Sequence, residues 1–371
     1  MSTRVIKLRS DGDVARAAEQ GAKALRKGKL VAFPTETVYG IAAVATIAQA
    51  LDRLRDLKSR PARPFSVHLA RPADARRYVS EMPGPAARLI ERAWPGPVTL
   101  LVPTGGQFAD ARLRRRSGLY ERLCHHDVIG LRCPDQPVAA ALLARIARPV
   151  VAPSANLAGH PSPRSGPDVL AGLDGRIDLL IDAGPTRHGT DSTIVRCTAK
   201  GWKVVRQGVL GDEAVARLTE RVVLFVCTGN TCRSAMAEGL AKRALAEKLR
   251  CRVGSLPEKG FVVLSAGAFG GGLPASREAV AAARELGADI SAHRSRKVTV
   301  DLIRRADVVF CMTGSHVAEM VRVAPDAAGK IRLLDPGRDL PDPIGGASDV
   351  YRRTAERIDR ALRAAFDKGL L

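Results

Sequence analysis

Short apolar runs alternate with amphipathic stretches along most of the chain. Residues 13–26 carry apolar side chains at helical spacing, which predicts a helix. Apolar runs of strand length follow at residues 30–33, 99–102, 128–131, 150–152, 179–181, 193–195 and 204–205. Strands mixed with helices in this way predict an open, twisted α/β sheet for the first half rather than a helical bundle.

The alternation of strand and helix restarts at residue 221. The run 222–226 is short and bounded, as a buried parallel strand should be, and an amphipathic helical pattern follows it. We therefore predict one domain at 1–207, a connection at 208–220 with a short helix at 212–218, and a second α/β domain at 221–371.

Composition limits the class of protein. Hydrophobic residues make up 46% of the chain, enough for sizeable cores, but no apolar stretch reaches the length that spans a bilayer. The first residues lack the apolar core of a signal peptide. Seven scattered cysteines without CxxC pairs argue against a disulfide framework or structural zinc. These features predict a cytoplasmic protein without a membrane partner.

The net charge of +21 suggests a polyanionic partner such as tRNA. The densest basic cluster lies within 110–126, a turn-rich stretch around Gly118 that we expect to be a surface loop. Its basic residues are Arg112, Arg114, Arg115, Arg116, Arg122, His125 and His126. Contact with RNA and a solvated basic insertion both remain open, although aromatic residues for base stacking are few.

The segment 223–238, VLFVCTGNTCRSAMAE, carries the most specific chemistry. Cys227 ends the apolar run, and Arg233 and Ser234 follow after a five-residue loop. A loop between a strand and a helix points its N–H groups at one spot, where the helix N-terminus favours negative charge. A thiolate is stabilised there, and Arg233 can donate two hydrogen bonds to a phosphate. The alternative is a buried structural cysteine.

From Arg221 onward the chain resembles the low-molecular-weight protein tyrosine phosphatase family, which implies a parallel sheet flanked by helices. The resemblance makes Cys227 the nucleophile, Arg233 the phosphate ligand and Asp342 the general acid, with no cofactor. Cys227 attacks phosphorus, Asp342 protonates the leaving group, and water hydrolyses the cysteinyl-phosphate. The supporting residues of the phosphate loop would be Thr228, Gly229, Asn230, Thr231, Cys232 and Ser234.

Within this loop the resemblance implies separate roles. Ser234 would donate a hydrogen bond to the thiolate, and Asn230 would brace the loop. Cys232 would trap Cys227 as a reversible disulfide, or would be a plain second cysteine.

Two features favour phosphoarginine over phosphotyrosine as the group removed from a phosphorylated protein. Thr231 resembles the protein arginine phosphatase branch, and Ile344 with two glycines follows Asp342 where tyrosine-directed members carry aromatic walls. A phosphotyrosine phosphatase remains the alternative. An arsenate reductase would need a relay of cysteines, and Cys251 and Cys311 are not spaced as one.

The first half lacks GxxxxGK[ST] and GxGxxG but carries a specific order of weaker motifs. They are PTETVYG, LKSRPARPFSVHL, WPGPVTLL, IGLRCP, APSANLAGHPSP, TDSTIV and VVRQG. In this order they resemble the threonylcarbamoyl-AMP synthase family, the YrdC-like domain, over nearly the whole half. The resemblance implies a reaction of L-threonine, bicarbonate and ATP that yields threonylcarbamoyl-AMP and pyrophosphate.

Without a phosphate-binding glycine loop, a triphosphate needs a ring of cations and hydroxyls. The resemblance implies that ATP is bound by Lys58, Arg60, Ser154, Asn156, Ser162 and Arg206. It implies that threonine is bound by Thr35, His68, Arg132 and Ser192. Because no cage of clustered carboxylates is visible, we expect any Mg²⁺ to arrive on ATP.

Two whole-chain hypotheses follow. The first is a bifunctional enzyme, whose adenylate feeds a tRNA-modifying transferase partner. The second is a protein tyrosine phosphatase tethered to a non-catalytic module of the same fold that binds double-stranded RNA. The second rests on the charge of +21 and on Val128, which stands where the synthase family often has threonine.

Overall fold

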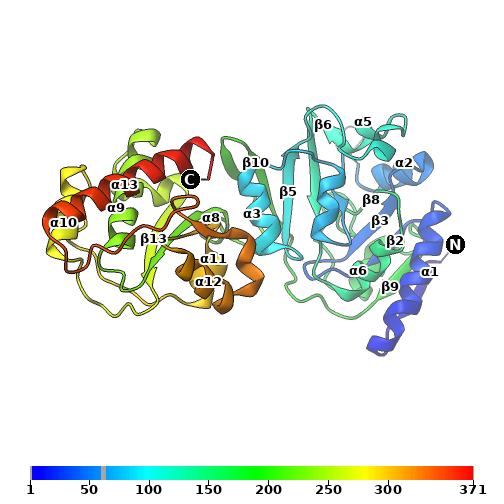
Figure 1. Ribbon diagram of the computed structural model, residues 1–371. Coiled ribbons are helices and arrows are strands. Elements are labelled where there is room, and N and C mark those ends of the chain that lie inside the picture. The colour runs from blue at the N-terminus through cyan, green and yellow to red at the C-terminus, as the bar shows by residue number, and fades with distance from the viewer. Residues whose placement is uncertain (1, 60–63, 371) are drawn as a thin grey trace. The chain divides into compact units, whose positions relative to one another are not determined.

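The computed structural model describes residues 2–59 and 64–370 (Figure 1). The chain divides into two compact units, Met1–Thr219 and Glu220–Leu371. Among the described residues, none of the helices combines the length and the apolar character needed to cross a membrane.

The first unit is an α/β domain. Its strands are β1 (Arg4–Lys7), β2 (Val31–Phe33), β3 (Gly40–Val44), β4 (Val67–His68), β5 (Val98–Pro103), β6 (Cys124–His125), β7 (Val128–Arg132), β8 (Val150–Val151), β9 (Leu179–Asp182), β10 (Thr193–Thr198) and β11 (Gly201–Arg206). Its α-helices are α1 (Val14–Arg26), α2 (Ala48–Leu57), α3 (Gly84–Ala93), α4 (Ala111–Arg114), α5 (Leu119–Leu123), α6 (Pro137–Ala144), α7 (Gly166–Leu173) and α8 (Asp212–Thr219). Two short 3-10 helices lie at Asp11–Asp13 and Pro72–Arg77.

The strands of the first unit form one mixed sheet. Its order in the described chain is β1-β9-β2-β3-β8-β4-β7-β5-β10-β11, and β6 pairs with β7. Alternate residues of a strand face opposite sides, so β2 contributes to two cores. Ala32 belongs to the core on one side, while Val31 and Phe33 belong to the core on the other. Helices therefore cover both faces of the sheet.

The second unit is built around a four-stranded parallel sheet in the order β13-β12-β14-β15. The strands are β12 (Arg221–Cys227), β13 (Phe261–Gly267), β14 (Val308–Cys311) and β15 (Ile331–Leu333). The α-helices are α9 (Arg233–Leu249), α10 (Arg277–Glu285), α11 (Val300–Arg305), α12 (Gly314–Val323) and α13 (Ser348–Asp367). The 3-10 helices are Val253–Ser255, Pro257–Lys259 and Pro325–Lys330.

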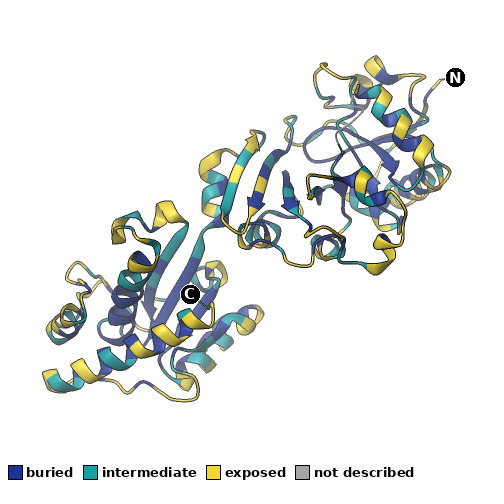
Figure 2. Ribbon diagram, turned by 90° about the horizontal axis from the view of Figure 1, so that it is seen from above, coloured by how far each residue is buried: buried dark blue, intermediate teal, exposed yellow. Residues whose placement is uncertain are grey.

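The apolar run of β12 is buried because both faces of this sheet are covered. Val223 and Phe225 pack into the core beneath α9, α10 and α13, whereas Leu224 and Val226 pack into the opposite core with α11 and α12. Figure 2 shows these central strands in the buried colour, while the long helix beside the C-terminus alternates between exposed and buried residues. The continuous run 222–226 thus correctly predicted a buried parallel strand.

The segment 208–220, predicted as a connection, is mostly part of the first unit. The helix predicted at 212–218 is present as α8, and it packs against α3. Val215 is fully buried in the first core, and the Thr219 carbonyl accepts a hydrogen bond of 2.6 Å from Arg88 Nε. The first compact unit therefore ends at Thr219 rather than at residue 207.

The basic stretch 110–126 is more ordered than the predicted surface loop. It forms α4 and α5, which are separated by Gly118 in the left-handed conformation with φ of 66°. Leu113, Leu119 and Leu123 are buried beneath it, whereas four of its arginines are exposed: Arg112, Arg114, Arg115 and Arg116. The expectation of a plain loop was wrong because three leucines anchor the stretch to the core.

Candidate functional sites

In the first unit, a cavity of about 560 Å³ lies where several strands of the sheet end. Nine of the ten residues predicted for the synthase site line it: Thr35, Lys58, His68, Arg132, Ser154, Asn156, Ser162, Ser192 and Arg206. The tenth, Arg60, lies outside the described residues. Residues spread over more than 170 positions of sequence therefore meet at one cavity.

Lys58 is held against the loop that follows β8. It ends α2, is 6% exposed, and its ammonium donates hydrogen bonds to the Ser154 carbonyl at 3.1 Å and to Asn156 Oδ1 at 2.8 Å. Ser154 Oγ donates to the same Oδ1 at 2.6 Å. The cation and two hydroxyl or amide groups are therefore fixed on one wall, as a phosphate chain requires.

Arg132 is the buried cation at the end of β7. Its Nη2 donates to Glu36 Oε1 at 3.0 Å and to the hydroxyls of Thr37 at 2.5 Å and Thr35 at 3.4 Å. Arg132 is 6% exposed and Glu36 is 1% exposed. Arg132 Nε is buried and has no hydrogen-bond partner among the described residues. A buried N–H without a partner costs stability, and it suits a ligand oxygen entering the cavity.

His68 lines the same cavity as a neutral imidazole. Burial, and then the charge of Arg132, lower the pKa of His68 to about 3 from its ordinary 6.5. The imidazole therefore carries no charge at neutral pH, and its Nδ1 lies 3.3 Å from the Ser66 carbonyl.

Ser192 and Arg206 also line this cavity and contact each other. Arg206 Nη2 donates to the Ser192 carbonyl at 2.8 Å, and Ser192 Oγ lies 2.9 Å from Thr99 Oγ1. Ser162 Oγ donates to the Asp191 carboxylate at 3.1 Å. Asp191 is the only carboxylate among the described residues that line this cavity.

Sequence reasoning missed Glu36, Asp191 and Thr99. Glu36 stands inside the motif PTETVYG, next to the predicted Thr35, so its place in the motif was a usable signal. Asp191 is similarly the second residue of TDSTIV, next to the predicted Ser192. Thr99 stands inside the motif WPGPVTLL, so it too lay within a recognised motif.

In the second unit, Cys227 is the last residue of β12 and α9 begins at Arg233. The Cys227 sulfur lies 2.9 Å from Ser234 Oγ and accepts a hydrogen bond of 3.3 Å from the Asn230 amide. Cys227 is 3% exposed. The sulfur thus faces a hydroxyl, a main-chain N–H and the N-terminus of a 17-residue helix, all of which favour negative charge on it.

Asn230 fixes the shape of this loop. Its φ of 56° is left-handed, and its side chain donates to Ser234 Oγ at 2.9 Å and to Ser265 Oγ at 2.7 Å. Its Oδ1 accepts from the Arg296 amide at 2.8 Å, and its carbonyl lies 2.7 Å from His293 Nε2. These contacts hold the unusual backbone conformation at a residue type that tolerates it.

Arg233 reaches the loop that carries Asp342. One guanidinium nitrogen donates to the Leu340 carbonyl at 3.1 Å, and Nη2 forms an ion pair with the Asp342 carboxylate. Arg233 is 4% exposed, and its Nε is buried without a hydrogen-bond partner among the described residues. Arg233 thus joins the phosphate loop, through the Thr228 hydroxyl at 3.5 Å, to the predicted acid Asp342, more than 100 residues away in sequence.

The remaining loop residues differ in their surroundings. Cys227 and Cys232 are both free, and the Cys232 sulfur lies 3.5 Å from Ser276 Oγ and 3.6 Å from the Tyr351 hydroxyl. Thr231 Oγ1 lies 3.6 Å from the Cys232 sulfur. Thr228 and Gly229 complete the turn between strand and helix.

The loop that carries Asp342 and the cysteine Cys311 bear on the two alternatives, a phosphotyrosine phosphatase and an arsenate reductase. Ile344 beside Asp342 is 71% exposed and forms no aromatic wall. Cys311 is fully buried in β14, and burial raises the pKa of its thiol to about 12. A relay cysteine has to be accessible and easily ionised, so Cys311 does not suit one.

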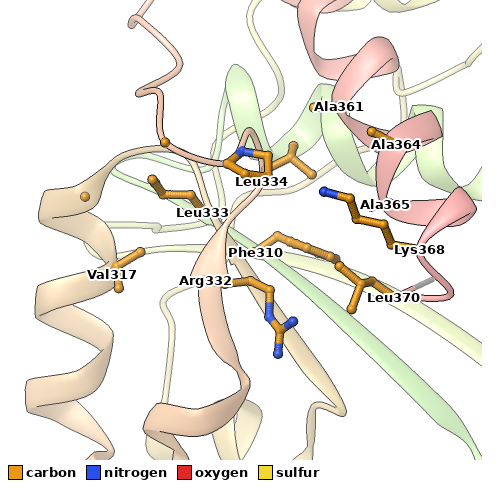
Figure 3. Close-up of a pocket in the computed structure, with 13 residues that line it drawn as sticks. Phe310, Val317, Arg332, Leu333, Leu334, Ala361, Ala364, Ala365, Lys368 and Leu370 are labelled. Atoms are coloured by element: carbon orange, nitrogen blue, oxygen red, sulfur yellow. The ribbon is translucent and has the colours of Figure 1, made fainter.

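A cavity of about 450 Å³ in the second unit is not part of this chemistry (Figure 3). It is lined mainly by apolar side chains from β14, β15, α12 and the end of α13, including Phe310, Val317 and Leu334. Lys368 and Arg332 are the cations that line it, and Figure 3 labels both. None of the predicted site residues lines it.

Comparison with known proteins agrees with the division into two units. Residues 23–208 match the Sua5/YciO/YrdC family, described as telomere recombination, and residues 222–369 match the low molecular weight phosphotyrosine protein phosphatase family. Threonylcarbamoyl-AMP synthase of Bacillus subtilis is 36% identical over 197 residues, which are 53% of this chain and 54% of that protein. The chain therefore spans about half the length of this relative.

Two further relatives cover the chain differently. Low molecular weight protein-tyrosine-phosphatase Etp of Escherichia coli is 30% identical over 151 residues, covering 40% of this chain and 93% of Etp. A solved structure of Sua5 from Pyrococcus abyssi is 26% identical with a TM-score of 0.51, covering 89% of this chain and 98% of that one. The chain thus belongs to the Sua5/YciO/YrdC family through its first unit and to the low molecular weight phosphotyrosine protein phosphatase family through its second.

Proposed function

We propose that the first unit converts L-threonine, bicarbonate and ATP into threonylcarbamoyl-AMP and pyrophosphate. The convergence of nine predicted residues on one cavity carries this proposal. In it, the amine of threonine and bicarbonate give a carbamate with loss of water. A carbamate oxygen then attacks the α-phosphorus of ATP, and the bond to pyrophosphate breaks.

The residues of the cavity divide between the two substrates. Lys58 and Arg206 neutralise the triphosphate, and the Ser154–Asn156 wall orients it. The unpaired Nε of Arg132 receives a carboxylate oxygen of threonine. Because His68 is neutral, it lines the threonine subsite without competing for that carboxylate.

Mg²⁺ fits this cavity only as a companion of ATP. The described residues include no group of three or more acids, histidines or cysteines that could bind a metal ion. Asp191 is the single carboxylate among the described residues that line the cavity. One carboxylate with phosphate oxygens and water is an ordinary environment for Mg²⁺. Bound there, the ion would neutralise phosphate charge.

The test is threonine-dependent release of pyrophosphate from ATP by the purified chain. Lys58→Ala should lower the rate at least about 100-fold, because a buried charged contact to the triphosphate is lost. Lys7→Ala, which removes an exposed lysine of β1, is the matched control and should leave the rate unchanged. A chain that releases no pyrophosphate yet binds double-stranded RNA tightly would instead support the non-catalytic module. The adenylate, if formed, would feed a tRNA-modifying transferase.

We further propose that the second unit dephosphorylates proteins through Cys227. This proposal rests on the contacts of the Cys227 sulfur with Ser234 Oγ and with the backbone N–H of Asn230. The sulfur attacks phosphorus while Arg233 binds the equatorial oxygens, and Asp342 protonates the leaving atom as its bond to phosphorus breaks. Water then hydrolyses the cysteinyl-phosphate and releases inorganic phosphate.

Phosphoarginine is the substrate we favour. The hydroxyl of Thr231 supplies a polar group at the loop, and the exposed Ile344 provides no ring to stack on a phenyl group. Both features suit a guanidinium better than an aromatic ring.

Paired assays on phosphoarginine and phosphotyrosine peptides decide between the substrates. We expect kcat/KM to be higher on phosphoarginine than on phosphotyrosine. Thr231→Val removes the hydroxyl, so it should bring the two kcat/KM values closer together. Equal or better turnover of phosphotyrosine would reject phosphoarginine specificity. Cys227→Ser should reduce either turnover by about 10⁴-fold or more, since the nucleophile is lost.

A further inference from the structure

A histidine of α12 contacts the phosphate loop of the second unit. His316 Nε2 lies 2.9 Å from Thr228 Oγ1, and His316 Nδ1 lies 2.7 Å from Thr313 Oγ1. The residue is 6% exposed. Thr228 Oγ1 in turn lies 3.5 Å from Arg233 Nη2, which donates to it. The row of contacts therefore runs from the N-terminus of α12 to the guanidinium.

The hydrogens in this row have a consistent direction. Thr313 is the N-cap of α12 and already accepts the His316 backbone N–H at 3.3 Å, while its hydroxyl lies 2.8 Å from Ser315 Oγ. It can accept a second hydrogen from Nδ1 and donate its own to Ser315. Nε2 is then an acceptor for the Thr228 hydroxyl, which leaves a lone pair on Thr228 for Arg233.

This direction controls which edge of Arg233 is left for a substrate. Nη2 is held by Thr228 and Asp342, and the other terminal nitrogen by the Leu340 carbonyl. Nε remains buried without a partner. A guanidinium fixed at its far end presents Nε to a phosphoryl oxygen in a single orientation.

We propose that His316 is a positioning residue for the phosphatase reaction: as a neutral imidazole it orients Thr228, and through Thr228 it orients Arg233. The inference rests on the proposed phosphatase function of this site. A protonated imidazole would donate to Thr228 instead of accepting from it. It would also place a second cation next to Arg233.

The surroundings of His316 favour the neutral form. Burial and then the charge of Arg233 lower the pKa of His316, against smaller opposing effects of Glu319, Asp342 and Asp339. Arg233 begins α9 and the two aspartates lie in the loop before α13, while Glu319 is on α12 itself. At neutral pH the row therefore has the direction described above.

The experiment measures kcat and KM on p-nitrophenyl phosphate across pH for the full chain. His316→Ala and Thr228→Val should each lower kcat by about 10- to 100-fold with little change in KM, because the loss is one hydrogen bond to a charged group. The double variant should lose no more than either single variant, since both act on one row. Thr228→Ser should restore most of the activity lost in Thr228→Val.

The pH profile separates positioning from a structural role. His316→Gln keeps an acceptor that cannot titrate, so it should match the wild type near pH 7.5 and exceed it only once the pH falls through the lowered pKa of His316, which lies below the ordinary 6.5. Unchanged kcat in His316→Ala, additive losses in the double variant, or parallel pH profiles would each overturn the inference. A wild-type chain without turnover would instead refute the phosphatase proposal itself. Melting temperatures of all variants identify those that fail to fold, and His316→Gln then provides the decisive comparison.

Discussion

At the scale of single residues, His68 links pH to the stability of the first unit. Its pKa of about 3 in the folded protein lies below its ordinary 6.5, so the unfolded chain binds a proton that the folded chain rejects. The stabilisation is complete above pH 6.5 and is lost as the pH falls toward 3. Between pH 7.5 and 5 we expect this residue alone to remove about 2 kcal/mol of unfolding free energy.

Urea unfolding of the chain at several pH values checks this prediction. His68→Gln should reduce the change in unfolding free energy between pH 7.5 and pH 5. His125→Gln, which changes an exposed histidine of the same unit, should leave it as in the wild type. A His68→Gln variant with the wild-type slope would contradict the assignment of a buried neutral imidazole.

Glu36 gives a second prediction at this scale. Its carboxylate is the buried partner of Arg132, at 3.0 Å. Glu36→Ala leaves the Arg132 charge uncompensated, which typically costs about 3–5 kcal/mol. We expect a lower melting temperature and a rise of at least about tenfold in the KM for threonine. Glu19→Ala, which removes an exposed acid of α1, should change neither. Normal threonine kinetics in a stably folded Glu36→Ala chain would count against the role of this pair.

At the scale of elements, the end of β13 supports the phosphate loop from behind. Gly267 pairs with Cys227 across the sheet, and a Cβ there would lie 2.6 Å from the Thr228 carbonyl oxygen and 2.8 Å from the Asn230 nitrogen. Both are backbone atoms of the loop, so the loop has to move. Gly267→Ala should therefore lower phosphatase kcat by about 100-fold or more.

Gly271→Ala is the matched change, because a Cβ at that position meets no atom within 4 Å. It should keep phosphatase activity within about twofold of the wild type. Pyrophosphate release by the first unit should not respond to either variant. A fully active Gly267→Ala protein would show that the loop tolerates displacement.

The elements also explain how far sequence alone could go. The run 222–226 and the helix at 13–26 were predictable, because continuous burial and helical spacing leave clear patterns. The two-residue strand β4 was not, since Val67 and His68 become a strand only by pairing with β7 and β8. The predicted residues that line the synthase cavity came from motif order, whereas the pairing of Glu36 with Arg132 and the contact of His316 with Thr228 emerged only from the structure.

At the scale of the whole molecule, each unit has its own cores. No core residue of the first unit belongs to a core of the second among the described residues. We therefore expect Cys227→Ser to abolish phosphate release while leaving pyrophosphate release intact, and Lys58→Ala to do the reverse. Measuring both activities on both variants tests this, and joint loss in either variant would contradict independent function.

Truncating the chain at the boundary between the units gives the sharpest test of the division into two independent units. A fragment 1–219 retains α8, whereas a fragment 1–207 loses it. Val215 is fully buried against the first core, and the Leu218 and Thr219 carbonyls accept hydrogen bonds from Arg92 and Arg88 of α3. Losing Val215 burial and the apolar contacts around it should cost about 3 kcal/mol or more.

We expect 1–219 to fold with the pyrophosphate-releasing activity of the full chain and 1–207 to unfold at a clearly lower urea concentration. Val215→Ala within 1–219 should lie between them, because it removes the side chain but keeps the helix. Equal midpoints for 1–207 and 1–219 would mean that α8 contributes nothing to the first unit and that the chain's division lies earlier. The hydrogen bonds from α3 argue for the later boundary, since their loss would leave two arginine side chains beside an uncovered apolar surface.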